Sequence, residues 1–462
     1  MTKSIDLNDI DPVDKRLDLV TYDNPSFSKV TDSVCSIAES KPSKGWYLSL
    51  LISGAWTCVF FAILAYLFWE GIGIFGNNHY SDWAFPIINF VFWIEIAHAG
   101  TLIAAILLLF RQKWRTSINR LAEAMTIFAV LVAAIFPAIH VGRPWFAYWL
   151  FPLPNQMDIW TNFKSPLEWD VFAVNTYLLV GLIFWYVAMI PDLATLRDRA
   201  KNQIARIIYG IFAVGWRGSA RHWLHYEKAT LLLAGIATPT VFSTAGVVSL
   251  DFATSILPGW HSTFFPPYFL IGAIFSGFSL CLNLIIMVRS IFKFKNLITD
   301  HHINICAKFI LFMSCFMAYI YIVELFTIFY SGNTYEEGWN YNRIFGPYGW
   351  AFWVMIFGNV LVPQTFWFKK CRQNMLWLFI AAILINVGMW LERYVLVVST
   401  LSRTFLPSSW GIFSPSYYDI LLLIGSFGLF FFLFTLFVRY FPIINMAEVK
   451  SVMPLAHRHH KK

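Results

Sequence analysis

The chain alternates between long apolar runs and short polar connections over most of its 462 residues. A helix needs about 20 apolar residues to cross the hydrocarbon core of a bilayer, and each run of that length predicts a membrane-spanning helix. The pattern predicts an all-α integral membrane protein with ten transmembrane helices. The predicted spans are residues 46–74, 84–110, 118–141, 169–190, 228–250, 267–289, 305–330, 346–367, 374–398 and 416–440.

Basic residues gather in alternate connections and so indicate the orientation of the helices. Four connections, with the helix ends beside them, carry 16 of the 34 Lys and Arg residues, whereas residues 75–83 and 251–266 contain none. The positive-inside rule therefore predicts that both termini are cytoplasmic. The basic residues are Arg111, Lys113, Arg115 and Arg120, then Arg197, Arg199, Lys201, Arg206, Arg217 and Arg221, then Arg289, Lys293 and Lys295, and finally Lys369, Lys370 and Arg372.

Polar segments flank the ten-helix transmembrane domain, residues 45–441. Residues 1–44 are rich in Asp and Lys and predict a polar cytoplasmic extension, and residues 442–462 predict a cytoplasmic tail. The longest internal connection, 192–227, interleaves isoleucines with basic residues. That pattern predicts an amphipathic helix on the cytoplasmic surface of the membrane.

Composition agrees with a membrane protein and narrows the function. Hydrophobic residues make up 58% of the chain, charged residues 13%, and the mean hydropathy is +0.60. A soluble domain is about 45–50% apolar and about 25% charged. The net charge of +8 lies in short loops, so it is a topology signal, and no nucleic-acid binding is expected.

Residue counts argue against metal centres in this chain. The six cysteines include no CxxC motif, so no iron–sulfur cluster is expected. A cytochrome b with two haems needs four axial histidines, whereas only His98 and His140 lie within the predicted spans. We therefore expect no haem, no cluster and no other metal.

Ionisable residues inside a bilayer cost at least about 2.5–3.5 kcal/mol and are functional candidates. His140 ends the third predicted span at its outer side, Asp170 begins the fourth and Asp251 ends the fifth. Arg393 lies near the outer end of the ninth. Each residue alone has a simpler explanation as a helix-end polar group. Their common depth and complementary chemistry favour one site.

The chemistry of these four residues suits a carrier of two electrons and two protons. A histidine and a carboxylate can each accept one proton. Arg393 is expected to keep a nearby aspartate ionised through paired hydrogen bonds. Pro137 removes a backbone hydrogen bond one turn before His140. The resulting bend would open a lateral entrance for a lipid-soluble substrate.

A second group of ionisable residues lies deeper. Glu95 and His98 are three residues apart in the second predicted span and share a face, and Glu324 lies within the seventh. Such residues can hold helices together through hydrogen bonds. They can also form part of a proton route, and the sequence leaves both interpretations open.

The stretch HVGRPW, residues 140–145, resembles the (H/D)-L-G-R-P signature of the NrfD-like membrane subunits. These include the membrane anchor of polysulfide reductase and the quinol-oxidising subunits of alternative complex III. With the ten-span layout and the polar N-terminal extension, the chain is most similar to the larger NrfD-like subunit of alternative complex III. Val141 replaces the leucine of the signature, and Trp145 stands where many relatives have arginine.

The resemblance implies two four-helix bundles plus two extra helices in a bacterial inner membrane. It implies a site for menaquinol, oxidised there to menaquinone, with His140 and Asp170 as catalytic residues and Asp251 and Arg393 completing the pocket. The implied acceptor is a [3Fe-4S] cluster in a periplasmic iron–sulfur subunit. Further implied partners are multihaem and monohaem c-type cytochromes carrying haem c, a second NrfD-like membrane subunit, and a terminal oxidase. Protons would leave on the periplasmic side, with any translocation routed through Glu95, His98 and Glu324.

Two other functions remain compatible with a polytopic chain. A secondary transporter binds its substrate near the midplane, often at broken helices, whereas the ionisable residues here concentrate at one face. A passive anchor of another NrfD-type oxidoreductase, similar to that of polysulfide reductase, would hold redox partners without binding quinone. Substrate uptake would favour the transporter, and quinone binding would exclude the passive anchor.

Overall fold

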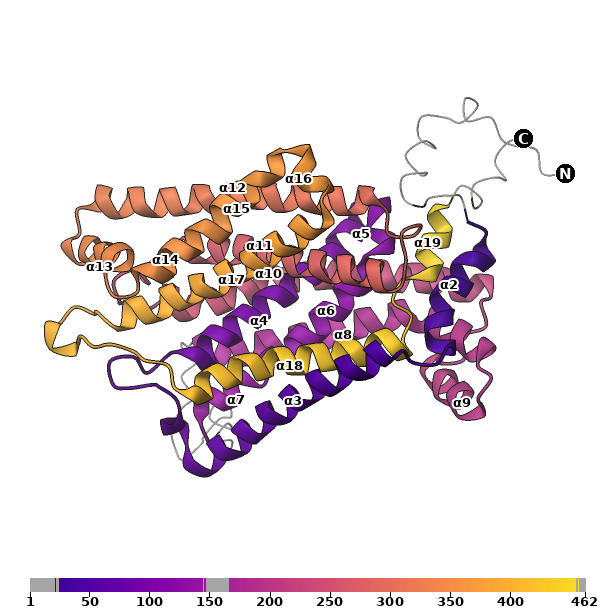
Figure 1. The fold of residues 1–462 in the computed structure, drawn as a ribbon, viewed down its shortest axis with the longest axis horizontal. Coiled ribbons are helices and arrows are strands. Elements are labelled where there is room, and N and C mark those ends of the chain that lie inside the picture. The colour runs from indigo at the N-terminus through magenta and orange to yellow at the C-terminus, as the bar shows by residue number, and fades with distance from the viewer. Residues whose placement is uncertain (1–20, 22–24, 144, 147–165, 454–455, 457–462) are drawn as a thin grey trace.

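The computed structural model describes residues 21, 25–143, 145–146, 166–453 and 456. These residues form an elongated bundle whose long helices run side by side along its longest axis (Figure 1). Helices α2 (Phe27–Glu39) and α19 (Met446–Val452) lie at one end, called here the α2–α19 end. Helices α7 (Phe136–Val141) and α13 (Thr334–Phe345) lie at the other, the α7–α13 end.

The described residues confirm the all-α class: they contain no strand beyond an isolated bridge between Asn78 and Ser81. Within them, nine helical stretches are long and apolar enough to cross a membrane, and each coincides with a predicted span. They are α3 (Lys44–Glu70), α4 with η3 and α5 (Phe85–Leu109), α6 with most of α7 (Asn119–His140), α8 (Pro166–Arg199), α10 (Ala220–Ala253), α11 (Phe265–Ile291), α12 (Asp300–Ser331), α17 with η8 (Met375–Ser399) and α18 (Tyr417–Tyr440).

The one remaining predicted span, 346–367, belongs to a bent pair. Its residues form α14 (Gly349–Ile356), η6 (Phe357–Leu361), α15 (Val362–Gln364) and η7 (Thr365–Trp367). This arm makes an angle of 77° with α13. The count of ten spans therefore stays a prediction. The short helix α16 (Lys369–Gln373) then leads into α17 (Met375–Tyr394).

Several helices continue beyond their apolar runs. Helix α8 reaches Arg199 and α10 begins at Ala220, so both enter the predicted connection 192–227. Helix α9 (Gln203–Phe212) lies between them and exposes Ile204, Ile207 and Ile211. Helix α12 begins at Asp300, so it also includes a buried histidine, His302. Hydropathy alone cannot place these ends, since polar residues outside the hydrocarbon remain helical.

Helix α4 (Phe85–Thr101) occupies the centre of the bundle. Its most apolar window is 83% buried by other helices, whereas that of α3, at the edge beside α18, is 28% buried. Every residue of α4 is buried, including Glu95 and His98. Neighbouring helices thus shield these two polar side chains from lipid, and any partner they have must come from the protein or from a ligand.

Four irregularities interrupt the bundle. The helical hydrogen bonds break at Ala134 and Ile135, where α6 (Asn119–Ala133) ends just before Pro137. Wide π turns occur at η3 (Leu102–Ile106), η6 and η8 (Val395–Ser399). Such turns are frequent at functional sites. Asn359 lies within η6, and Arg393 lies just before η8, so two of the three turns adjoin buried polar residues.

Candidate functional site

Three ionisable side chains lie at the α7–α13 end and form what we call the histidine–aspartate cluster: His140, Asp170 and Asp251. His140 is in the last turn of α7, Asp170 in the second turn of α8, and Asp251 near the end of α10. The two aspartates are 6% and 8% exposed. Their carboxyl groups lie close enough to interact with each other. The common depth inferred from the sequence therefore brings these aspartates together.

Trp83, in the connection before α4, joins the histidine to the helix of Asp251. Its ring meets His140 edge-on, with 5.4 Å between ring centroids, and meets Phe252 edge-on at 6.2 Å. Trp260 completes this aromatic wall at 6.0 Å from Trp83. Trp83 was not among the residues predicted from the sequence, since a tryptophan in an outer connection is indistinguishable from an interfacial aromatic residue.

Apart from the interaction of the two carboxyl groups with each other, several polar atoms of the histidine–aspartate cluster are buried without a hydrogen-bond partner. They are Nδ1 of His140, Oδ1 of Asp170 and both carboxylate oxygens of Asp251, judged among the described residues. An unmade hydrogen bond at a buried polar atom costs about 1–3 kcal/mol. A cluster with such open positions can receive protons, or hydrogen bonds from the hydroxyl groups of a ligand.

Arg393 has different partners from those the sequence suggested. Its Nε lies 3.1 Å from Oε2 of Glu95 and its Nη2 lies 2.7 Å from Oε1 of the same residue. Nη2 also lies 3.1 Å from Oε1 of Glu392. The expectation that Arg393 holds an aspartate is wrong, because Arg393 points toward the bundle centre, where α4 presents Glu95. All three side chains are at most 2% exposed.

Glu392 lies at the centre of a buried network that also includes Arg393 and Glu95. Tyr268 of α11 donates a hydrogen bond of 2.6 Å to its Oε1, and Tyr321 of α12 donates to its Oε2. Asn359 of η6 donates to the same Oε2 at 2.9 Å. Neither tyrosine was among the residues predicted from the sequence. A hydroxyl inside an apolar span is the signal that could have found them, because it needs a partner there.

Two phenylalanine rings separate this network from the histidine–aspartate cluster. The guanidinium carbon of Arg393 lies 4.2 Å from the ring centroid of Phe269. Phe269 in turn lies 5.6 Å from Phe252, the neighbour of Asp251. The structure therefore brings together two of the four expected residues, Asp170 and Asp251. His140 lies against Trp83, which also contacts Phe252, and Arg393 lies behind the aromatic pair.

The deeper residues divide between two places. Glu324 pairs with Arg343 at 2.8 Å and lines a cavity of about 40 Å³ together with Glu392. A cavity of that volume has room for a water molecule. His98 lies apart: its ring is 5.1 Å from that of Tyr177, and neither ring nitrogen has a partner among the described residues.

At the α2–α19 end, two arginines that the sequence assigned to a connection form ion pairs between elements of the bundle. Arg120 is fully buried and donates to Asp192 at 3.0 Å and to the carbonyl of Ala188 at 2.8 Å. Arg115 pairs with Glu448 of α19 at 2.9 Å. These contacts join α6 to α8, and the turn that precedes α6 to α19. Sequence patterns showed these arginines only as topology signals.

Gly272 of α11 leaves space for the Arg393 guanidinium. A Cβ at that position would lie 2.9 Å from Nη2 of Arg393 and 3.1 Å from the methyl group of Met389. We expect Gly272→Ala to push Arg393 away from Glu95 and to destabilise the protein by about 1–3 kcal/mol, as overpacking does. Thermal unfolding in detergent measures this. Gly246→Ala, where nothing lies within 4 Å, is the control and should be neutral or stabilising. Equal stability of the two variants would contradict the prediction.

Fold and site together define a multi-pass membrane protein with acidic and basic side chains held inside its bundle. Within the described residues, no group of three or more His, Cys, Asp and Glu side chains could hold a metal ion. The family model described as polysulphide reductase, NrfD, matches residues 73–403. The chain therefore belongs to the NrfD family, which confirms the resemblance seen in HVGRPW.

Curated relatives are membrane subunits of redox enzymes. A selenate reductase subunit of Mesobacillus selenatarsenatis is 21% identical over 398 residues, which cover 81% of this chain and 89% of the relative. The Hdr-like menaquinol oxidoreductase integral membrane subunit of Archaeoglobus fulgidus is 20% identical over 409 residues, covering 84% and 92%. Both alignments extend over most of the two chains compared.

Proposed function

We propose that this chain is the quinol-binding and quinol-oxidising membrane subunit of a bacterial respiratory complex related to alternative complex III. The observation that carries the proposal is the set of buried, unpaired polar atoms on His140, Asp170 and Asp251. Quinol hydroxyl groups would satisfy these atoms. The relative named as a menaquinol oxidoreductase subunit supports menaquinol as the substrate.

Oxidation of a quinol to a quinone releases two electrons and two protons. Both hydroxyl groups bind within the histidine–aspartate cluster, one at His140 and one at Asp170. The ring of His140 accepts one proton, and the interacting Asp170 and Asp251 carboxyl groups share the other. An iron–sulfur cluster in a partner subunit docked at the α7–α13 end would accept the two electrons one at a time. Arg393 supplies positive charge behind Phe269 and Phe252.

This mechanism requires a defined orientation in the bacterial inner membrane. The α2–α19 end faces the cytoplasm, as the basic loops indicate, and the α7–α13 end faces the periplasm. The quinol enters laterally beside the helix break at Ala134 and Ile135. Protons leave on the periplasmic side. The c-type cytochromes, the second NrfD-like subunit and the terminal oxidase belong to the same proposed assembly.

A proton route through the network is the finer part of the proposal. Glu95 and Glu392 share Arg393, and Glu392 shares the cavity of about 40 Å³ with Glu324. A water molecule in that cavity would link the two glutamates. The route then continues past Glu324 into a cavity of about 320 Å³ that also contains Glu336 and His261. His98 would serve as a separate proton acceptor beside Tyr177.

A quinol assay with the intact complex in vesicles tests the function. We expect quinol-dependent reduction of the partner haems, inhibition by a quinone analogue, and quinone in the extract of the purified complex. Asp251→Asn, which removes the acidic group but keeps its size, should weaken inhibitor binding and slow turnover by at least about 100-fold. Asp198→Asn, an exposed aspartate at the far end of α8, is the matched control.

The same preparation separates the alternatives. Solute uptake by the chain without redox turnover would favour a secondary transporter. Electron transfer that is insensitive to quinone analogues, with no quinone in the extract, would favour a passive anchor. Either result would overturn the assignment of quinol oxidation to this chain.

A further inference from the structure

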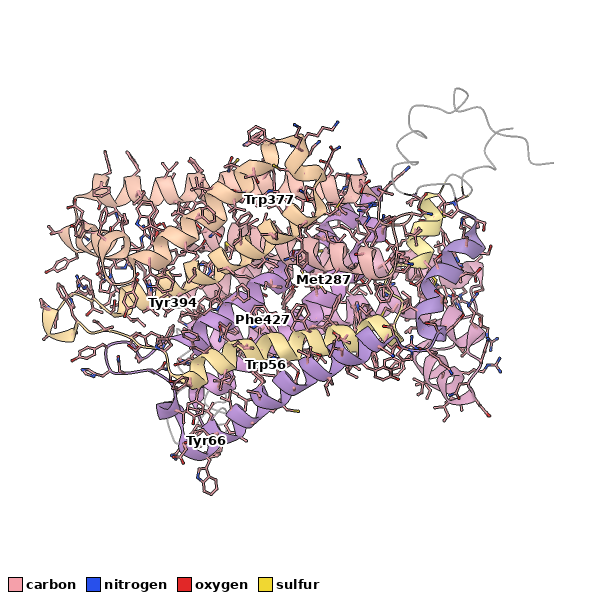
Figure 2. All side chains as sticks on the ribbon, viewed as in Figure 1. Trp56, Tyr66, Met287, Trp377, Tyr394 and Phe427 are labelled. Carbon is pink, nitrogen blue, oxygen red and sulfur yellow. The ribbon has the colours of Figure 1, made fainter. Side chains whose placement is uncertain are left out.

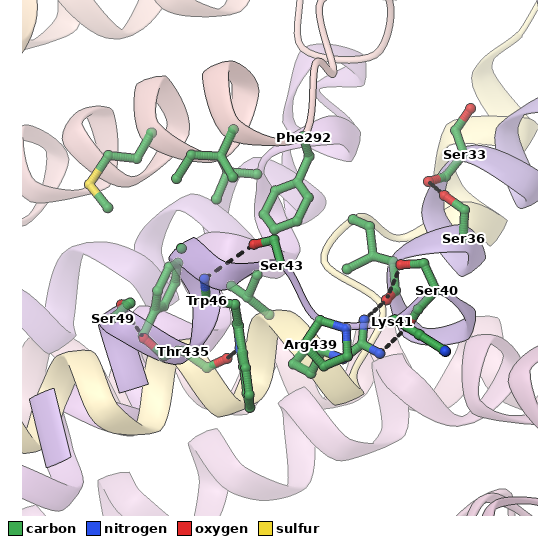
Figure 3. Close-up of a pocket in the computed structure, with 18 residues that line it drawn as sticks. Ser33, Ser36, Ser40, Lys41, Ser43, Trp46, Ser49, Phe292, Thr435 and Arg439 are labelled. Carbon is green, nitrogen blue, oxygen red and sulfur yellow. Dashed lines mark hydrogen bonds between the residues drawn. The ribbon is translucent and has the colours of Figure 1, made fainter. Parts of the chain in front are cut away.

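A cavity of about 580 Å³ lies at the α2–α19 end, enclosed by α2, α3, α11 and α18 (Figure 3). It has a polar mouth and an apolar floor. Five serines and one threonine contribute hydroxyl groups to it, and Lys41 and Arg439 contribute positive charge. Met287 and Phe434 are among the apolar side chains of its floor. No acidic side chain lines it among the described residues.

The positive charge at the mouth is not neutralised by neighbouring acids. The acidic residues of α2, Asp32 and Glu39, instead pair with Arg199 of α8, at 2.8 Å and 2.6 Å. Lys41 makes no ion pair with a described residue. Arg439 donates to the carbonyls of Ile37 and Ser40, which fixes its guanidinium at the end of α2 (Figure 3).

The first turn of α3 adds a second anion-binding element. Ser43 caps this helix by accepting a hydrogen bond from the backbone of Trp46, and Ser43 and Gly45 both line the cavity. The amino end of a helix carries unpaired N–H groups and a partial positive charge, which attract anions. Here that helix end, Lys41 and the hydroxyl groups meet at a single opening.

A second cavity, of about 360 Å³, lies on the other side of Met287. Met287 lines both cavities, and Phe427 of α18 lines the second one (Figure 2). Phe427 and Arg439 are twelve residues apart on α18, or about 18 Å along the helix. One leaflet of the hydrocarbon core is about 15 Å deep. The two cavities thus extend from the headgroup level across the depth of a leaflet.

We propose that these two cavities form a binding groove for an anionic glycerophospholipid of the adjoining leaflet. Lys41, the hydroxyl of Ser43 and the α3 amino end hold its phosphate, and one acyl chain lies past Met287 toward Phe427. Basic pockets between transmembrane helices are suited to anionic headgroups, and the apolar floor suits an acyl chain and not a free anion. The groove is separate from the histidine–aspartate cluster, so it does not depend on quinol oxidation.

The test compares variants of the purified complex in nanodiscs of phosphatidylcholine with and without phosphatidylglycerol. We expect phosphatidylglycerol to raise the unfolding midpoint of the wild type and to be retained in native mass spectra. Lys41→Glu should weaken this binding about tenfold or more by reversing the charge. Met287→Trp should weaken it by filling the junction of the cavities, with all charges kept. Lys369→Glu, the same charge change outside the groove, should bind as the wild type does.

Three results would overturn the proposal. The first is equal retention of phosphatidylcholine and phosphatidylglycerol by the wild type, or unchanged retention in both groove variants. The second is a shift with inorganic phosphate as large as with phosphatidylglycerol, which would indicate a free anion site. The third is loss of quinone, with phospholipid retained, in Met287→Trp, which would assign the groove to an isoprenoid tail.

Discussion

Replacement of His140 by alanine is expected to abolish quinol oxidation while leaving the complex assembled. The ring of His140 is half-buried at the end of α7, and its Nδ1 has no partner among the described residues. Its removal therefore breaks no hydrogen bond made by that atom but deletes the group that accepts the first proton. Positioned proton transfer contributes about 10²–10⁴-fold to a rate. Turnover should fall at least about 100-fold.

The measurement is quinol-dependent haem reduction by the complex, with the amount of each partner protein determined on the same sample. His79→Ala is the matched control, because His79 is a histidine in the connection that also contains Trp83. It should retain the wild-type rate. Unaltered turnover of His140→Ala in a fully assembled complex would remove His140 from the mechanism, and loss of partner proteins would identify it as a structural residue.

The helices were predictable because lipid imposes a simple rule on sequence. Any lipid-facing backbone must pair within its own helix, and about 20 apolar residues span the core. All nine unbent stretches follow that rule. The pair at α13 and α14 does not, because the bend depends on the short link from Gly346 to Tyr348 and on packing. The π turns and the burial of Arg120 are also outcomes of packing.

The sequence predicts how deep each candidate residue lies in the membrane, but not which neighbouring helix its side chain faces. Topology gives the level of a residue along its helix. That level was sufficient to predict that Asp170 lies near Asp251. The face of a helix that meets a given neighbour depends on rotation and tilt. Nothing in the apolar pattern of α17 shows that Arg393 turns toward Glu95 and away from the aspartates. Tertiary contacts decide that pairing.

Removal of the Arg393 side chain is the second change with a large expected effect. Arg393→Met would leave Glu95 and Glu392 facing each other inside the bundle with no cation between them. Both are 2% exposed. Breaking a buried pair by removing one partner costs about 3–5 kcal/mol. The unfolding temperature in detergent should therefore fall sharply, whereas Arg206→Met, an exposed arginine on α9, should change stability by less than about 0.5 kcal/mol.

A double-mutant cycle separates the ion pair from the loss of side-chain volume. Glu95→Gln removes one carboxylate charge at nearly constant shape, so Arg393→Met should cost less in that background than in the wild type. Directly interacting residues couple by about 0.5–3 kcal/mol. Additive effects would mean that Arg393 acts through Glu392 and the rings of Phe269 and Tyr268, and not through Glu95. Strong coupling would mean that Glu95 is held ionised by Arg393, and a proton route through Glu95 would then require Arg393 to release it.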